Sequence, residues 1–157
     1  MTDSNYLEKV SHFMNMFNQP VLNKPTIPNE DRCELRVSLL QEELNELKIG
    51  IQNKDIIEIA DALVDLQYVL TGAIHEFGLG HIFKDLFEEV QSSNMSKLLK
   101  NEDIKDTEEF YNSKGVDVYF KQYLDAPVWR CYRSSDNKVL KNINYKKPNL
   151  KTIIENG

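Results

Sequence analysis

Residues 56–77 have a helical pattern that is apolar on almost every side, yet they carry three acids. At about 100° per residue, Glu58, Asp61 and Asp65 fall on one narrow strip of this helix. A helix that is apolar nearly all round is expected to be buried, in the core or partly in a subunit interface. We therefore expect its acids to be enclosed by protein.

A second acidic group lies on the preceding helical pattern, over residues 31–50. Glu43 falls inside the apolar arc of that helix, and Glu46 lies beside the arc. Both side chains are predicted to point toward the core, while Glu42 lies at the margin. The arc consists of Leu39, Leu40, Leu44 and Leu47.

The inward acids need a partner. Buried carboxylates without counter-charges are costly or take up protons. Few lysines or arginines are spaced to pair with these acids, and Arg36 can neutralise one at most. For an isolated acidic motif, a solvated surface is the commoner explanation, but it fits inward positions poorly. A divalent cation fits better, and carboxylate oxygens suit Mg²⁺ or Mn²⁺.

The rest of the pattern predicts an all-α fold, an antiparallel four-helix-type bundle with a small C-terminal β-hairpin or extended arm. Short connections favour antiparallel neighbours. Asn29 or Asp31 is expected to cap the second helix, Gly50 to end it, and Asp55 to cap the third. The expected helices cover about residues 3–17, 31–50, 55–77 and 82–99, and the expected strands cover residues 116–123 and 128–132.

We expect one domain over residues 1–157, with a helical core at about 3–100 and an elaboration and tail at about 101–157. The segment 101–114 is predicted to be an exposed loop or a short helix. Trp129, in a predicted strand, is more typical of a hairpin core than of a base-stacking residue.

The composition limits the classes of partner that the protein is expected to bind. The net charge of -6 argues against a general nucleic-acid or membrane-surface binder, so no nucleic-acid polymer and no membrane are expected. It does not exclude a triphosphate ligand with an intervening cation. Cys33 and Cys131 form neither a redox motif nor a zinc motif. The polar residues 1–9 and the lack of a long apolar run lead us to expect neither a signal peptide nor a membrane-spanning segment. We expect a soluble, cytoplasmic protein with reduced thiols.

The ExxE pattern followed by ExxD resembles the all-α nucleoside triphosphate pyrophosphohydrolases, which include MazG, the dimeric dUTPases and phosphoribosyl-ATP pyrophosphohydrolase. Residues 36–43 and 61–72 carry this resemblance. Residues 89–97 and the tail from 138 to 150 look like a MazG-like, dUTPase-like branch. Two features depart from the pattern: only eleven residues separate Glu46 from Glu58, and residues 101–134 have no counterpart.

The resemblance implies a Mg²⁺-dependent enzyme (Mn²⁺ being possible) that hydrolyses the α–β phosphate bond of a nucleotide, giving a nucleoside monophosphate and pyrophosphate. Glu42 and Glu43 are the expected catalytic residues, and Glu42 is expected to orient or deprotonate the attacking water. Asp65 is expected to bind a second metal, to bind the sugar or to support the site. The implied metal ligands are Glu43, Glu46, Glu58 and Asp61, and the implied substrate-binding residues are Asn94, Lys97, Asp65 and Arg36.

The preferred substrate is left open. We expect dUTP or another non-canonical nucleotide, in a homodimer or homotetramer. Phosphoribosyl-ATP is the alternative, which the block from Asn94 to Lys97 and the tail disfavour. A non-catalytic helical scaffold or nucleotide-binding regulator is the other alternative, and the presence of all four implied metal ligands argues against it.

Overall fold

The computed structural model describes residues 5–124 and 126–157, which divide into two compact units. The first unit reaches to Lys84 and includes Ile154–Gly157, and the second covers Asp85–Ile153. The structure is mostly helical, with one two-stranded antiparallel sheet. The expectation of a single domain stays a prediction. Within the described residues, none of the helices combines the length and the apolar character that a membrane-spanning segment needs.

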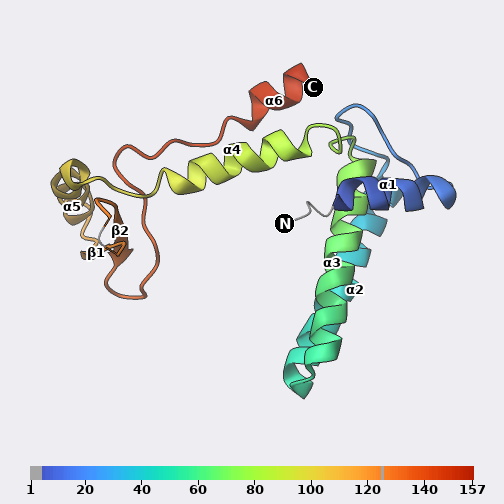
Figure 1. The fold of residues 1–157 in the computed structure, drawn as a ribbon, viewed down its shortest axis with the longest axis horizontal. Coiled ribbons are helices and arrows are strands. Elements are labelled where there is room, and N and C mark those ends of the chain that lie inside the picture. Colours follow the sequence, from blue (N-terminus) through green and yellow to red (C-terminus); the bar gives the residue numbers. More distant parts are fainter. Residues whose placement is uncertain (1–4, 125) are drawn as a thin grey trace. The chain divides into compact units, whose positions relative to one another are not determined.

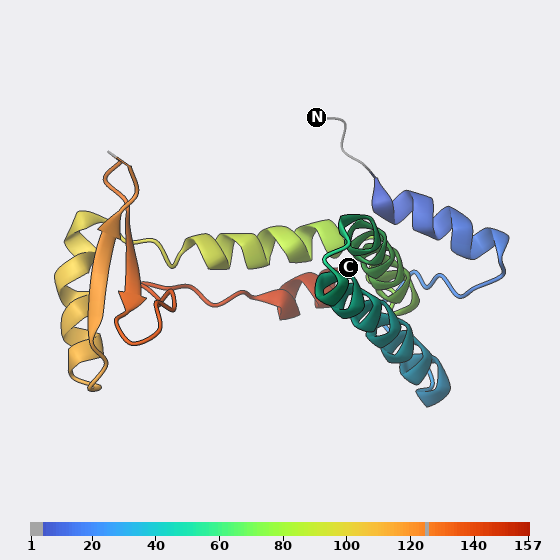
Figure 2. The same ribbon diagram turned by 90° about the horizontal axis from the view of Figure 1, so that it is seen from below.

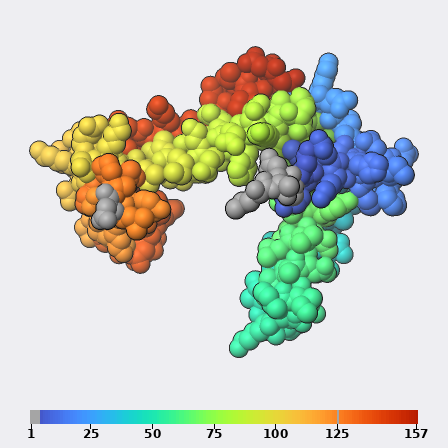
Figure 3. Space-filling view, viewed as in Figure 1, coloured from blue at the N-terminus to red at the C-terminus, as the bar shows by residue number. Residues whose placement is uncertain are grey.

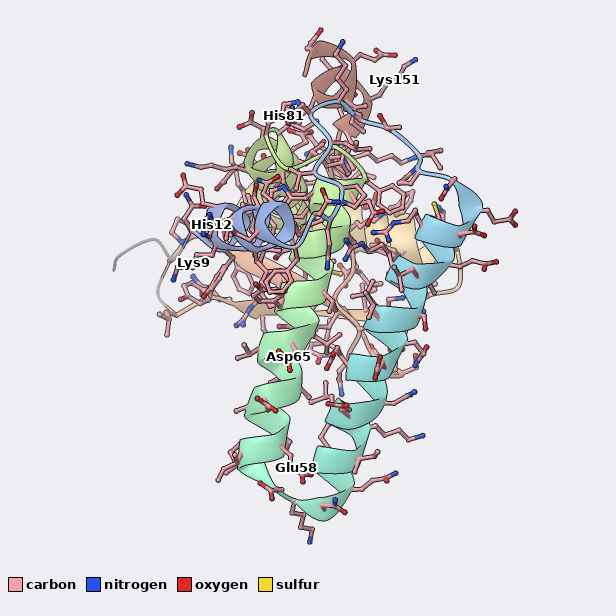
Figure 4. The ribbon with its side chains drawn as sticks, turned by 90° about the vertical axis from the view of Figure 1, so that its right-hand side faces the viewer. Lys9, His12, Glu58, Asp65, His81 and Lys151 are labelled. Carbon is pink, nitrogen blue, oxygen red and sulfur yellow. The ribbon has the colours of Figure 1, made fainter. Side chains whose placement is uncertain are left out.

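The first unit is built on a pair of long helices that pack along each other, with a shorter helix against the second of them (Figures 1 and 4). These helices are α1 (Tyr6–Met16), α2 (Glu30–Asn53) and α3 (Ile56–Glu76), which confirms the three helices expected in this region. The predicted four-helix-type bundle is not confirmed, because the fourth helix falls almost wholly in the other unit.

The turn between α2 and α3 sets how the two helices meet. The Asp55 side chain accepts hydrogen bonds from the backbone N–H groups of Ile57 at 2.9 Å and Glu58 at 3.3 Å, which confirms it as the α3 cap. At the other end of α2, Asn29 is the cap and accepts from the Arg32 N–H at 3.1 Å. Asp55 was the predicted cap of α3, and Asn29 was one of the two residues, with Asp31, expected to cap α2.

Gly50 does not end α2, which corrects the expectation. The helix continues to Asn53, and Lys54 takes the left-handed C-cap conformation with φ 56°. Gly50 instead lies where α3 approaches most closely: a Cβ there would come within 3.1 Å of the Ile59 backbone nitrogen. The glycine therefore serves helix packing rather than helix termination.

The loop from residue 18 to residue 29 is fixed at the C-terminal end of α3. Its Leu22 N–H donates to the His75 carbonyl, and its Thr26 N–H donates to the Phe77 carbonyl, both at 3.0 Å. Gly78 has φ +69°, and a Cβ there would come within 1.8 Å of the Lys24 carbonyl oxygen. Only glycine satisfies both the backbone conformation and this approach.

The second unit contains a β-hairpin that packs beside a short helix (Figure 2). The hairpin and this short helix confirm the sequence expectation, whereas the fourth helix ends earlier than expected and the last helix was not predicted. The elements are α4 (Phe83–Met95), the 3-10 turn η1 (Asn101–Asp103), α5 (Ile104–Asn112), β1 (Val118–Gln122) and β2 (Trp129–Arg133), followed in the chain by α6 (Leu150–Asn156).

Leu99, Val118 and Cys131 form the buried core of the hairpin. Trp129 packs against this core, and its indole N–H donates to the Asn101 side chain. Backbone hydrogen bonds join Leu99 and Trp129 in both directions, at 2.9 and 2.8 Å. Trp129 is thus a hairpin-core residue, as expected.

Candidate active site

The acids of α2 and α3 meet at a pocket of about 300 Å³ near the turn between the helices. Its lining consists of Glu46, Ile49, Glu58 and Asp61. Three of the four expected metal ligands therefore share one pocket. Figure 4 shows Glu58 and Asp65 at two levels along α3, with α2 beside it.

The fourth expected ligand, Glu43, is half-buried one helical turn before Glu46. In the part of the chain that the structure describes, its Oε2 is a buried atom with no hydrogen-bond partner. The pKa of Glu43 is raised because burial disfavours the charged carboxylate and the neighbouring acids repel it. In decreasing order of effect, these neighbours are Glu46, Asp65, Glu42 and Asp61.

The acid cluster lacks an ion-pair partner within the described residues. None of the ion pairs found among residues 5–124 and 126–157 includes an acid of this group. Arg36, which was expected to neutralise one of these acids at most, is instead buried against Glu76. Its contact with substrate stays a prediction, although the structure gives its side chain a different partner.

The acids are less enclosed than the sequence suggested. Glu46, Glu58 and Asp61 are exposed, while Glu43 and Asp65 are half-buried. The expectation that α3 is buried in the core is wrong for the single chain: Ile57 is 78% exposed and Val64 is 63% exposed. Figure 3 shows α3 in green, with its side chains at the surface. The reason is that, among the described elements, the main helix contacts of α3 are with α1 and α2, which leave Ile57 and Val64 exposed.

The chemical type of the candidate metal ligands suits a hard divalent cation. All the candidate donors are carboxylate oxygens, and the Glu43 Oε2 is a buried acceptor without a donor. As the described side chains stand, no three His, Cys, Asp or Glu are arranged to hold one metal ion. Binding a cation would require the exposed carboxylates to close on it, and their exposure leaves them free to turn.

A buried ion-pair network lies at the other end of the α2–α3 pair. The Glu76 carboxylate accepts hydrogen bonds from both Arg32 and Arg36. Burial acts to raise the pKa of Glu76, but the bonds from the two guanidinium groups outweigh burial and lower it. Gly72 leaves room for Arg36, since a Cβ there would come within 2.8 Å of its Nη1. Sequence reasoning missed this network because Glu76 lies far from Arg36 in the chain.

A second pocket, of about 310 Å³, lies between α1 and α3. It is mostly apolar, with two tyrosines and the Gln67 amide at its wall. The Gln67 Nε2 donates to the Thr71 hydroxyl at 3.0 Å, and that hydroxyl donates to the Gln67 carbonyl at 2.7 Å. The lining residues are Tyr6, Val10, Leu63, Val64, Gln67, Tyr68 and Thr71. The sequence signal for this pocket was only the position of Tyr68 beside the acidic strip.

Asn94 and Lys97 belong to the second unit, where they contact each other. The Lys97 ammonium donates to the Asn94 Oδ1 at 2.7 Å. This bond holds the ammonium and the amide together at the end of α4. Their contact with substrate stays a prediction.

Comparison with known protein families decides the family. The family described as phosphoribosyl-ATP pyrophosphohydrolase matches residues 10–94, more than half of the 157 residues. The chain belongs to this family. The family is part of the MazG-like all-α NTP pyrophosphohydrolase superfamily, so the resemblance seen in the sequence is confirmed. No curated protein sequence matches the chain.

Family membership indicates a nucleotide pyrophosphohydrolase, and enzymes of this superfamily generally use divalent metals. The matched span covers α1 from Val10, all of α2 and α3, and α4 as far as Asn94. It therefore includes every acid of the candidate site. Lys97, the hairpin and the tail lie beyond it.

Proposed function

We propose that this protein is a Mg²⁺-dependent pyrophosphohydrolase that cleaves a nucleotide between its α- and β-phosphates. The observation that carries the proposal is the Glu43 carboxylate, which has a buried oxygen without a hydrogen-bond partner in the described residues and lies among four other acids. Such a charge cluster is costly unless a cation binds there. Membership of a pyrophosphohydrolase family supports a catalytic role for that cation.

Glu43, Glu46, Glu58 and Asp61 would hold the metal. When bound, Mg²⁺ supplies charge neutralisation on the phosphate oxygens and lowers the pKa of a bound water. Mn²⁺ satisfies the same oxygen ligands. The pocket that Glu46, Glu58 and Asp61 line is where the phosphates would lie.

The reaction adds water across one anhydride bond. The water oxygen attacks the α-phosphorus, and the bond from that phosphorus to the bridging oxygen breaks. The nucleoside monophosphate and pyrophosphate are released. Glu42, exposed beside Glu43, is the residue we propose to orient the water or to accept its proton. Asp65, which acts electrostatically on Glu43, is proposed to bind a second metal, to contact the sugar or to support the site.

The pocket between α1 and α3 is the proposed site for the base. Its volume of about 310 Å³ suits a nucleobase. Tyr6 and Tyr68 offer aromatic faces, and the Gln67 carboxamide oxygen is left to accept a hydrogen bond from a base edge. Val64 and Tyr68 lie on the side of α3 next to the acidic strip, so a base here and phosphates at the acids suit one nucleotide.

Two substrates remain proposals. A non-canonical triphosphate such as dUTP follows from the sequence block from Asn94 to Lys97 and from the tail. Phosphoribosyl-ATP follows from the matching family, whose description names it. Asn94 and Lys97, which supply an amide and an ammonium, are the proposed phosphate or nucleotide contacts in either case.

A homodimer or homotetramer is part of the proposal. Isolated exposed apolar residues are ordinary, but α3 carries several along its length. A second copy would cover them. We also propose a cytoplasmic location, which suits the free thiols of Cys33 and Cys131.

The test is pyrophosphate release from a panel of nucleotides, with Mg²⁺ and again with EDTA. The panel contains the canonical dNTPs and NTPs, dUTP, other modified triphosphates and phosphoribosyl-ATP. We expect turnover of at least one of them and its loss with EDTA. A folded protein that turns over none of them would refute the proposed activity. Preference for phosphoribosyl-ATP over dUTP would decide between the two substrates.

A further inference from the structure

The hairpin in the second unit has two different faces. The register pairs Tyr119 with Tyr132 and Lys121 with Arg130 across the strands. Because side chains alternate along a strand, these four residues share one face. The opposite face carries Val118, Phe120, Cys131 and Trp129, which form or contact the hydrophobic core. The face with Tyr119 and Tyr132 is therefore directed away from that core.

This outer face combines aromatic rings with cations. The Tyr119 and Tyr132 rings stack at a centroid distance of 5.2 Å and an interplanar angle of 16°. The Lys121 ammonium lies 5.4 Å from the Tyr119 centroid and 6.0 Å from the Tyr132 centroid. The Arg130 guanidinium lies 5.6 Å from the ring of Tyr123, which is 51% exposed. Rings and cations are thus available side by side.

The cations of this face are not neutralised. Within the described chain, neither Lys121 nor Arg130 forms an ion pair with a carboxylate. Residues 110–153 contain nine lysines and arginines against three acids, in a protein whose net charge is -6. The net charge of the whole chain argued against a nucleic-acid partner, but it does not reveal that residues 110–153 are basic.

We propose that the face formed by Tyr119, Lys121, Arg130 and Tyr132 binds single-stranded nucleic acid. Phosphates of the strand pair with the two cations, and unstacked bases contact the exposed Tyr123 ring and the accessible parts of the half-buried Tyr119 and Tyr132 rings. The bases of a duplex are stacked inside the double helix, so they do not contact these tyrosine rings. The hairpin lies outside the family match, so this proposal does not rest on the acid cluster or on the proposed hydrolysis.

The test measures binding of the full chain to a fluorescein-labelled, 5′-hydroxyl deoxythymidine oligonucleotide of about 12 nucleotides, within the usual site size. Fluorescence anisotropy is recorded over a salt titration. The test variant is Lys121→Ala/Arg130→Ala. The matched control is Lys100→Ala/Lys105→Ala, which removes two exposed cations from the same unit that are paired with Glu102 and Glu109. Melting curves confirm that both variants are folded.

We expect the test variant to bind about tenfold more weakly or worse, and the control to stay within about twofold of the parent. The slope of log K against log salt should fall by about 1.4, which is about 0.7 for each lost phosphate contact on a single strand. Tyr123→Ala should weaken binding further without changing the slope, because it removes a ring and no charge. If Lys121→Ala/Arg130→Ala fails to fold, Lys121→Gln and Arg130→Gln are compared singly with the same controls.

Three results would overturn the proposal. The first is no binding of the oligonucleotide at low salt. The second is equal weakening by the test and control variants. The third is binding of heparin or of the matching duplex as tight as that of the single strand, since the rings would then contribute nothing.

Discussion

Arg36 on α2 and Glu76 at the end of α3 form an ion pair in which both residues are almost fully buried, at 5% and 1% exposed. Arg32 bonds to the same carboxylate one turn earlier. This ion-pair network fixes the alignment of α2 along α3 at one end of the helix pair. It thereby sets which residues of α3 face Glu43 and Glu46 toward the other end.

Glu76→Gln is expected to destabilise the protein strongly. The substitution leaves the Arg36 guanidinium buried without a counter-charge, and breaking a buried pair in this way typically costs about 3–5 kcal/mol. The free energy of unfolding is measured by urea denaturation. Glu109→Gln, which removes one partner of an exposed pair with Lys105, is the control and should change stability by less than about 1 kcal/mol. Equal effects of the two substitutions would contradict the assignment.

The stability of the metal-free protein should fall as the pH rises above the ordinary glutamate value of 4.5. Glu43 has a raised pKa in the folded state, so the folded protein holds this proton to higher pH than the unfolded chain does. Unfolding then releases the proton, and a higher pH favours release. Below pH 4.5 the sign reverses for Glu76, whose lowered pKa makes stability fall as the pH falls.

Mg²⁺ should therefore raise the melting temperature more at pH 7.5 than at pH 5. The cation competes with the proton on Glu43, and at higher pH the carboxylate is already free. Thermal melting with Mg²⁺ and with EDTA at both pH values measures this. A shift that is the same at both, or absent, would argue against Glu43 as a ligand.

Glu43→Gln should change activity and stability in opposite directions. Pyrophosphate release should drop by about a hundredfold or more, because a ligand for charge stabilisation is lost. The metal-free protein should be as stable as the parent or more stable, because a half-buried charge among acids is removed. Glu34→Gln, on the exposed side of α2, is the control and should leave both quantities unchanged. Loss of activity with equal loss of stability would instead indicate a structural role.

Gly78→Ala should be far more damaging than Gly115→Ala. Both glycines have φ +69°, but a Cβ at Gly78 would lie 1.8 Å from the Lys24 carbonyl, whereas Gly115 has nothing within 4 Å. The left-handed backbone alone costs a non-glycine residue about 1–2 kcal/mol. Urea denaturation should show Gly115→Ala near that cost, and Gly78→Ala about 2 kcal/mol or more beyond it. Similar costs would mean that the loop simply moves away.

The sequence predicted what depends on local chemistry. The caps Asn29 and Asp55 were found because a side chain that bonds its own helix end leaves a short-range signal. The acid pairs on α2 and α3 were also predicted from a short-range signal, since residues three apart in the sequence lie on the same face of a helix. Their meeting at one pocket followed from the short turn between the helices.

What the sequence could not predict depends on contacts between distant segments. Gly50 carries the usual sign of a helix end, but its role comes from Ile59 on the next helix. Arg36 was expected near the acids, but its guanidinium group pairs with the carboxylate of Glu76, forty residues away in the sequence. The apolar pattern of α3 predicted burial without saying by what, and one chain covers only part of it.

Ile57→Lys should therefore weaken the proposed self-association. Ile57 is 78% exposed on α3 in the single chain, and a lysine in an apolar interface would leave a charge desolvated. Light scattering coupled to size exclusion should show a homodimer or homotetramer for the parent and a smaller species for the variant. Ile27→Lys, the same change at a residue that is 84% exposed in the loop before α2, should leave the mass unchanged. If the parent is a monomer at micromolar concentration, the exposed apolar side of α3 is not a self-association surface.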